Sequence, residues 1–225
     1  MKKTKMILLA AGLGTRLWTV TGGRPKQLLE VGGMTLFDRH LALAEFLGLE
    51  PAVVTRPEFA ADFAGRGAEV WIEDESPDML VTLSNTRRHV REDYVWVGGD
   101  MLFTDFQPLR ELLAAHRAAG SAGAFLYART DRFKAKLTLE PAPAVVLTRQ
   151  GSHPFSLPCF GVHAPRLYDY MPDDPGAPPG NYLQLAIENG EPLLFREYRA
   201  PVFEIDTPAD LAATRRHFER IARAS

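Results

Sequence analysis

The chain has 225 residues, of which 46% are hydrophobic and 24% charged, and a formal net charge of −2. These values are typical of one soluble globular domain, exclude fibrous, disordered and disulfide-rich classes, and give no reason to expect nucleic acid or an anionic membrane as a partner. A single cysteine, Cys159, and the absence of an apolar run near the roughly 18 residues of a membrane span lead us to expect a cytoplasmic protein.

Short β-rich runs alternate with helical patterns over the first part of the chain. The predicted elements are, in chain order, the strand Met6–Leu9, a helix capped by Thr35 and ending near Leu47, the strands Ala52–Thr55 and Glu69–Ile72, the helix Pro77–Val90, the strand Tyr94–Val97, the helix Pro108–Ala119 and the strand Ala124–Ala128. The first and fourth strands are nearly all apolar, as expected for strands buried on both faces of a parallel sheet. The alternation predicts an α/β fold, a three-layer α/β/α sandwich with a mainly parallel, mixed sheet.

The pattern changes after about residue 129. The second part is expected to contain the strands Lys136–Glu140, Ala144–Arg149 and Cys159–His163, a loop Pro172–Gly180, a helix Asn181–Asn189, a last strand Val202–Ile205 and a helix capped by Thr207 that buries Leu211, Phe218 and Ile221. We therefore expect a single domain made of a core (1–128), an extension (129–200) and a last strand with the C-terminal helix (201–225).

A glycine-rich loop follows the first predicted strand. Leu17 stands where the dinucleotide-binding pattern G-x-G-x-x-G requires glycine, and no Gly-Lys-Ser/Thr follows as in a Walker A loop. A glycine loop after a buried strand still allows backbone N–H groups to approach phosphate oxygens. Arg16 on the loop and Lys26 after Pro25 add two cations, so the whole string favours phosphate binding, whereas the glycines alone fit an ordinary turn equally well.

This loop, with Arg24–Leu29 and Val31–Met34, resembles the signature of the nucleotidyltransferase superfamily. Such enzymes join a nucleoside triphosphate (NTP) to a sugar phosphate or alcohol phosphate and release pyrophosphate. The resemblance is strong over residues 6–49, moderate over 94–103 and 202–215 and weak elsewhere. It implies a Rossmann-like, GT-A-like fold with the acceptor on the side of residues 129–200, and catalytic roles for Arg16 and Lys26. The implied nucleotide-binding residues are Leu9, Ala10, Ala11, Gly12, Leu13, Gly14, Thr15, Arg16 and Lys26.

Two aspartates follow predicted strands. Asp100 comes after Tyr94–Val97 and two glycines, and Asp206 comes after Val202–Ile205. Because ligands of open α/β sheets bind outside the carboxyl ends of the strands, both carboxylates can point into one crevice. They are hard oxygen ligands of the kind that Mg²⁺ prefers. The resemblance makes Asp100 and Asp206 the metal ligands and Glu204 a candidate third. A turn residue, a helix-dipole partner and a structural carboxylate are the respective alternatives.

The resemblance also implies a mechanism without a general base, because the attacking acceptor phosphate is already an anion at neutral pH. Thr82 and Ser84 lie in the segment that borders the base in relatives, and they are candidate nucleotide contacts or ordinary residues of a helix N-terminus. The expected activity is Mg²⁺-dependent transfer of a nucleoside monophosphate from an NTP to a sugar 1-phosphate, which forms an NDP-sugar.

Two alternatives remain open at this point. The pattern Glu204–Leu211 looks most like small cytidylyltransferases that act on choline phosphate or phosphonates, so an alcohol phosphate is the alternative acceptor. A catalytically silent nucleotide-binding regulatory domain is the alternative of another class, although intact Arg16, Lys26 and both aspartates argue against it. The expected partners are an NTP and a small phosphorylated acceptor, without nucleic acid or membrane, and a homodimer is left open.

Overall fold

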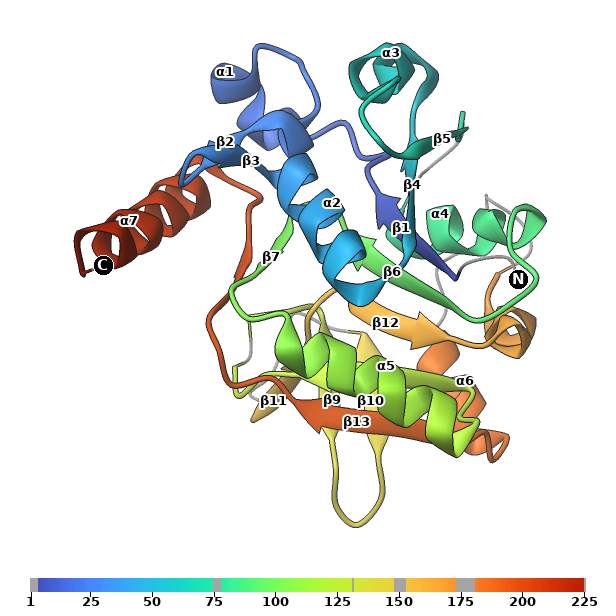
Figure 1. Ribbon diagram of the computed structural model, residues 1–225. Helices are drawn as coiled ribbons and strands as arrows, with labels where there is room; N and C mark the ends of the chain where they lie inside the picture. Colours follow the sequence, from blue (N-terminus) through green and yellow to red (C-terminus); the bar gives the residue numbers. More distant parts are fainter. Residues whose placement is uncertain (1–3, 75–77, 131, 148–152, 173–180, 225) are drawn as a thin grey trace.

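A seven-stranded sheet forms the centre of the protein (Figure 1). The computed structural model describes residues 4–74, 78–130, 132–147, 153–172 and 181–224. The strands of this sheet are β1 (Lys5–Leu9), β4 (Glu50–Thr55), β5 (Glu69–Ile72), β6 (Tyr94–Gly98), β8 (Gly123–Tyr127), β12 (Phe160–His163) and β13 (Leu193–Glu197). Their order is β13-β8-β12-β6-β1-β4-β5, and β12 alone among them runs antiparallel to its neighbours. The expected mixed, mainly parallel sheet is confirmed.

Helices cover both faces of this sheet. They are α2 (Leu36–Leu47), α3 (Ala60–Phe63) and α5 (Gln107–Ala119) on one face, and α4 (Met79–Asn85) and α6 (Tyr182–Glu188) on the other. Figure 1 shows α2 and α5 on the near side. Along β1 the side chains alternate between the two cores, with Met6 and Leu8 in the first and Ile7 and Leu9 in the second. This alternation is what the pleat of a buried strand produces, and it confirms the three-layer α/β/α arrangement.

Local sequence signals set the ends of two helices as expected. The hydroxyl of Thr35 accepts a hydrogen bond from the Asp38 N–H at 3.0 Å at the start of α2, and Gly48 ends that helix in the left-handed conformation. Thr207 and Asp210 cap α7 (Pro208–Ala224) reciprocally, with N–H to side-chain oxygen distances of 3.2 and 2.9 Å. Each cap satisfies backbone donors that lack a partner within the helix.

Other predicted boundaries differ from the structure. The helix expected over Pro77–Val90 has Asp78 as its N-cap, ends at Asn85 and continues as a 3₁₀ turn over Thr86–Arg88. The helix begins after Asp78 because the Asp78 carboxylate accepts hydrogen bonds from the N–H groups of Leu80 and Val81. The expected burial of Ile221 on α7 is wrong, since that side chain is 47% exposed. The predicted loop Pro172–Gly180 falls, apart from Pro172, outside the described residues.

The extension (129–200) contributes strands to the main sheet and does not form a separate subdomain. Its strand β12 lies between β6 and β8, and β13 forms an edge. A three-stranded antiparallel sheet of order β10-β9-β11 lies beside the main sheet, as Ser156 pairs with Ala128. Its strands are β9 (Ala135–Thr138), β10 (Ala144–Leu147) and β11 (Phe155–Leu157). The strands β7 (Met101–Phe103), β11 and β13 have no counterpart in the prediction because each is short or only half-buried and lacks a clear period.

The C-terminal segment returns to the centre of the chain through a small second sheet. Strand β14 (Val202–Glu204) pairs antiparallel with β7 (Met101–Phe103), and α7 projects from the body beyond it (Figure 1). The remaining short elements are β2 (Glu30–Val31), β3 (Met34–Thr35), α1 (Trp18–Thr21) and the 3₁₀ turns Thr15–Leu17, Lys26–Leu28, Pro57–Phe59 and Pro165–Tyr170. Among the described residues, no helix has the length and apolar character needed to span a membrane.

Candidate active site

A cavity of about 600 Å³ opens at the carboxyl ends of β1 and β6. Its lining divides into a charged end and a largely apolar end. The charged end contains Leu9, Ala11, Gly12, Leu13, Gly14, Thr15, Arg16, Lys26, Gln27, Gly98, Asp100, Glu204 and Asp206. The position is the one where open α/β sheets bind ligands, and most of the residues expected from the sequence are gathered there.

Backbone pairing brings the two aspartates together. Asp100 lies between β6 and β7, and Asp206 lies between β14 and α7. The pairing of β7 with β14 is extended by a hydrogen bond of 3.0 Å from the Ile205 N–H to the Asp100 carbonyl oxygen. Residues 106 positions apart in the chain are thereby fixed on neighbouring backbones. The late strand is thus required to build the site as well as to complete the fold.

Lys26 lies between the two carboxylates. Its Nζ is 2.7 Å from Asp100 Oδ2 and 2.8 Å from Asp206 Oδ1. The Lys26 side chain is only 11% exposed. Burial alone would lower its pKa, but the negative charges and hydrogen bonds of Asp100 and Asp206 outweigh that effect and raise the pKa above 10.5. Lys26 is therefore a permanent cation in the charged end of the cavity.

Arg16 completes the charged network from the glycine loop. Its guanidinium lies 2.8 Å from Asp206 Oδ2, while 60% of its side chain stays exposed. Burial tends to raise the pKa of Asp206, but Lys26 and Arg16 together hold it below 3.8. The carboxylate of Asp206 is therefore ionised at neutral pH, and Arg16 keeps enough freedom to turn toward an anion in the cavity.

The glycine loop presents backbone rather than side chains to the cavity. Gly14 adopts φ 63°, a conformation that L side chains rarely adopt. Gly12 has no positive φ, and a Cβ placed there would meet nothing within 4 Å, so its missing side chain leaves space on the cavity side. Ala10 lies outside the cavity lining, because it is buried and its N–H donates to the Val54 carbonyl at 2.8 Å.

The chemistry of the donor set fits Mg²⁺. Oxygens of Asp100 and Asp206 both lie within hydrogen-bond distance of one point, the Lys26 nitrogen. Mg²⁺ commonly takes one or two protein carboxylates and completes its shell with water and phosphate oxygens. Within the described part of the chain, no three His, Cys, Asp or Glu side chains are gathered closely enough to hold a metal ion. Glu204 lines the cavity but does not join the two aspartates in such a group.

The segment predicted to border the base lies only partly in the cavity. Asp78, Met79, Leu80 and Thr82 of the α4 region line it. Ser84 does not, because its hydroxyl is directed to the Pro172 carbonyl oxygen at 2.5 Å. The helical period separates the two residues, since positions two apart on a helix do not face the same way.

Aromatic and aliphatic side chains make the other end of the cavity, and sequence reasoning missed them as site residues. They are Trp96, Phe125, Ala135, Leu147, Leu157, Pro158, Cys159, Phe160, Tyr182 and Leu183, with Lys134 and Asn181 as polar neighbours. Their patterns indicate only buried strands and a helix, so the sequence contains no signal that this part of the core is hollow. Lys136 is 2% exposed and lies outside the lining.

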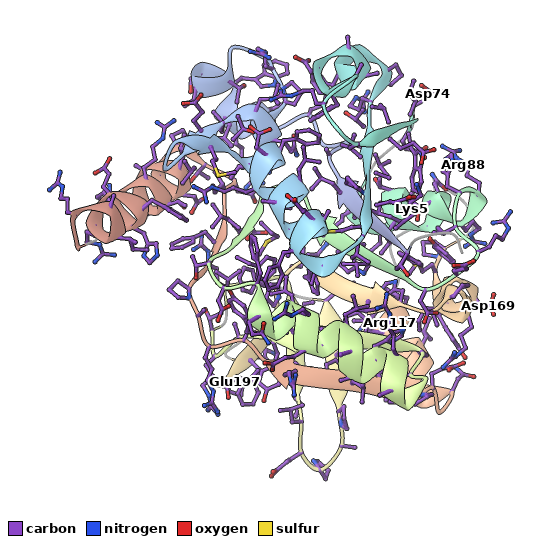
Figure 2. All side chains as sticks on the ribbon, in the orientation of Figure 1. Lys5, Asp74, Arg88, Arg117, Asp169 and Glu197 are labelled. Carbon is purple, nitrogen blue, oxygen red and sulfur yellow. The ribbon has the colours of Figure 1, made fainter. Side chains whose placement is uncertain are left out.

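Other charged side chains form ion pairs outside this network. In Figure 2, Glu197 is labelled at the lower left of the molecule and Lys5 right of its centre. Lys5 Nζ lies 2.9 Å from Glu69, and Glu197 lies 2.5 Å from Arg129. The exposed members of such pairs are screened by water, so each pair contributes little to stability. The Lys26 network differs because its four charged groups, Arg16, Lys26, Asp100 and Asp206, line the cavity.

An Asp-His-Ser arrangement occurs elsewhere in the structure but does not resemble a working site. His116 Nδ1 lies 2.8 Å from the Ser121 hydroxyl, and its Nε2 lies 3.1 Å from Asp93. Ser121 is 2% exposed, and neither it nor His116 lines the cavity described above. The three residues tie the end of α5 to the chain before β6, which is a structural role.

Comparisons with known proteins identify the family of this chain. Residues 6–223 match the family described as "MobA-like NTP transferase domain". The "Bifunctional protein GlmU" of Leifsonia xyli subsp. xyli is 35% identical over 139 residues, which is 55% of this chain and 27% of that protein. The "N-acetylmuramate alpha-1-phosphate uridylyltransferase" of Caulobacter vibrioides is 46% identical over 54 residues, 24% of this chain and 22% of that protein. The chain thus aligns with about a quarter of the length of these curated relatives.

A solved structure supports the fold over nearly the whole chain. A Bacillus anthracis protein, provisionally named a glucose-1-phosphate thymidylyltransferase, superposes with a TM-score of 0.84 at 17% identity. The superposition covers 96% of this chain and 95% of that chain. The family match over residues 6–223, together with the fold, shows that this chain belongs to the MobA-like NTP transferase domain family of nucleotidyltransferases.

Proposed function

We propose that the protein transfers a nucleoside monophosphate from an NTP to a sugar 1-phosphate, with release of pyrophosphate. The observation that carries this proposal is the convergence of Lys26, Asp100 and Asp206 beside the glycine loop at one end of the cavity. Cations and backbone N–H groups bind the phosphates of an NTP, and paired carboxylates bind a divalent cation. A cavity of about 600 Å³ falls within the range of ligand-binding pockets.

The reaction forms one P–O bond and breaks another. An oxygen of the acceptor phosphate attacks the α-phosphorus of the NTP, and the bond from that phosphorus to the bridging oxygen of pyrophosphate breaks. The attacking phosphate is anionic at neutral pH, so no side chain has to remove a proton. The main barrier is the approach and separation of negative charges, which positioned cations lower.

The residues of the charged end have separate roles in this proposal. Backbone N–H groups of the loop through Gly12 and Gly14 bind phosphate oxygens. Arg16 and Lys26 neutralise the β- and γ-phosphates and the region of the α-phosphate. Asp100 and Asp206 would hold Mg²⁺, which supplies charge neutralisation when it is bound. Thr82 and the start of α4 border the nucleoside.

The acceptor occupies the other end of the cavity in this proposal. That end is built by β11, β12 and α6 of the expected acceptor side together with Trp96 of β6 and Phe125 of β8 from the core, and Lys134 lies beside it. The names of the Caulobacter and Bacillus proteins contain sugar 1-phosphates, which favours that class of acceptor. The aromatic lining favours an acceptor with few hydroxyl groups, so choline phosphate, other alcohol phosphates and phosphonates form the second candidate class.

A pyrophosphate-release assay tests the proposal. The purified protein is incubated with Mg²⁺, each of the four NTPs and a panel of sugar 1-phosphates, alcohol phosphates and phosphonates. The proposal expects release that depends on both one NTP and one sugar 1-phosphate, and Asp100→Asn serves as the inactive control. Release with alcohol phosphates alone would support the second class. NTP binding without release from any pair would contradict catalysis and favour a regulatory domain.

A further inference from the structure

His163 lies at the centre of a buried aromatic cluster beside the acceptor end of the cavity. It is the last residue of β12 and has no exposed surface. The rings of Tyr94, Trp96, Phe125 and Tyr182 meet it at centroid distances of 5.3 to 5.6 Å and interplanar angles of 61° to 74°. Three of these four rings, those of Trp96, Phe125 and Tyr182, also line the cavity.

The hydrogen bonds fix the tautomer of His163. Its Nε2 lies 2.8 Å from Trp96 Nε1, and an indole N–H can only donate, so Nε2 must accept. Burial holds the pKa of His163 well below 6.5, so the imidazole is neutral and its proton is on Nδ1. That proton is donated to the Tyr94 hydroxyl at 3.0 Å. The Tyr182 hydroxyl lies 3.1 Å from the same Nε2, so the indole and the phenol donate to one shared lone pair.

A glycine makes this arrangement sterically feasible. A Cβ on Gly161 would lie 2.6 Å from Trp96 Nε1 and 2.8 Å from Phe125 Cε1. Real Cβ atoms do not approach other atoms so closely, and both rings would have to shift. Gly161 and His163 of the same strand therefore act together, one by leaving room for the indole and the other by accepting its hydrogen bond.

The consequence for the cavity is chemical. Trp96 and Tyr182 direct their only side-chain donor hydrogens to His163, so neither donor is available to a ligand in the cavity. Asn181 is also engaged, because its amide donates to the Val145 carbonyl and accepts from the Gln184 N–H. Phe125 and Leu157 add further carbon surface. The described part of this wall therefore binds by apolar contact and by stacking on aromatic rings.

We propose that His163 is a positioning residue for acceptor specificity, which holds Trp96 and Tyr182 so that their ring faces receive the carbon skeleton of the phosphorylated acceptor. The inference rests on the proposed function and refines it. A sugar or cyclic alcohol would lay its C–H face on these rings, and an acyclic alcohol would pack its methylene or methyl groups there. Without His163 the two donors would turn toward the cavity, and the wall would lose both its shape and its apolar character.

The test compares the effect of a substitution on acceptor binding with its effect on nucleotide binding. His163→Leu removes both ring nitrogens, and we expect the KM of the acceptor to rise at least fivefold more than the Kd of the NTP measured by calorimetry. His163→Gln, whose amide oxygen can accept from Trp96, should recover at least half of that effect on a logarithmic scale. Tyr168→Phe is the matched control, since it removes another buried hydroxyl that lies outside the cavity lining and bonds to Thr86.

Thermal melting shows whether each variant folds. If His163→Leu does not, Trp96→Phe and Tyr182→Phe replace it, because each keeps a ring and removes one donor, and the same fivefold criterion applies. The role of His163 is overturned if folded variants raise the acceptor KM less than fivefold more than the Kd of the NTP, or if Tyr168→Phe has the same effect. Turnover by the wild type would still support the proposed function in either case. If wild type releases no pyrophosphate, that function has failed, and the Kd of acceptors from calorimetry then decides on His163 by the same criterion.

Discussion

The ammonium of Lys26 lies 2.8 Å from the carboxylate of Asp206, although 180 residues separate them in the chain. Asp206 arrives there because β14 pairs with β7, beside Asp100. Together with Arg16, Lys26 supplies the positive charge beside the two carboxylates. The phosphates of an NTP would compete with the aspartates for the same ammonium group, while a divalent cation would compete with Lys26 for the aspartates.

Replacing Lys26 by methionine should show separately how its charge contributes to turnover and how it competes with Mg²⁺ for the two carboxylates. Turnover is expected to fall at least about a hundredfold, the usual scale for removing one charge-stabilising donor. The variant should still fold, since methionine retains the apolar length of the side chain, although it will be weakened because Asp100 loses the lysine cation and Asp206 keeps only Arg16. Mg²⁺ without nucleotide should therefore raise the melting temperature of Lys26→Met more than that of wild type. Equal shifts in the two proteins, or retained turnover in the folded variant, would contradict this role.

Arg16 should behave differently because it is largely exposed. Arg16→Ala removes an ion pair to Asp206 in which 60% of the arginine side chain is in water, so the free energy of unfolding should change by less than about 1 kcal/mol. The KM of the NTP should nevertheless rise about tenfold or more, since the guanidinium is placed to bind phosphate. Urea unfolding and steady-state kinetics measure the two effects. A large loss of stability would show that Arg16 has mainly a structural role.

The sequence predicts the local features of this site better than its assembly. The glycine loop, the Thr35 cap and the capping pair of Thr207 with Asp210 depend on residues within a few positions of one another, and the structure has all of them. The pairing of β7 with β14 depends on residues about 100 positions apart, and neither strand is long enough to show a period. The insertion of β12 between β6 and β8 is similarly non-local.

The apolar end of the cavity could not be predicted from the sequence for a related reason. Trp96 occupies an inward position on a strand whose five residues are all buried, a pattern that normally indicates packing alone. Its participation in the cavity depends on Gly161 and His163 of a strand that pairs with it from 65 positions further along the chain. Ser84 differs in the opposite way, because its position near Thr82 in the sequence predicts that it lines the cavity. The turn of the helix instead directs its hydroxyl to the Pro172 carbonyl.

Two alanine substitutions in the glycine loop should have different effects on stability. Gly12→Ala adds a methyl group that meets nothing within 4 Å and requires no positive φ, so stability should be unchanged while the new group obstructs phosphate. Gly14→Ala imposes φ 63° on a residue with a Cβ, which costs about 1–2 kcal/mol. Melting temperatures and the Kd of the NTP distinguish the two. The explanation fails if Gly12→Ala binds NTP as tightly as wild type.

His40 provides a prediction on pH. It is buried on α2, and its Nδ1 lies 2.6 Å from the Leu36 carbonyl oxygen. Burial lowers its pKa from 6.5 to about 4, although the Leu36 carbonyl and the charge of Asp100 partly oppose the shift. Between these two pH values the unfolded chain binds a proton that the folded protein does not. The contribution of His40 to stability is therefore full above pH 6.5 and lost as the pH falls toward 4.

The variant His40→Asn isolates this contribution, because the Asn amide can still donate near the position of Nδ1 but does not titrate. The shift corresponds to roughly 3 kcal/mol between pH 7 and pH 4. The difference in unfolding free energy between wild type and His40→Asn should thus move by that amount in favour of the variant as the pH falls. Other buried histidines such as His163 act in the same direction but are common to both proteins, so they cancel. Urea unfolding at pH 7, 5.5 and 4.5 measures the difference, and a value independent of pH would mean that His40 is not held neutral by the fold.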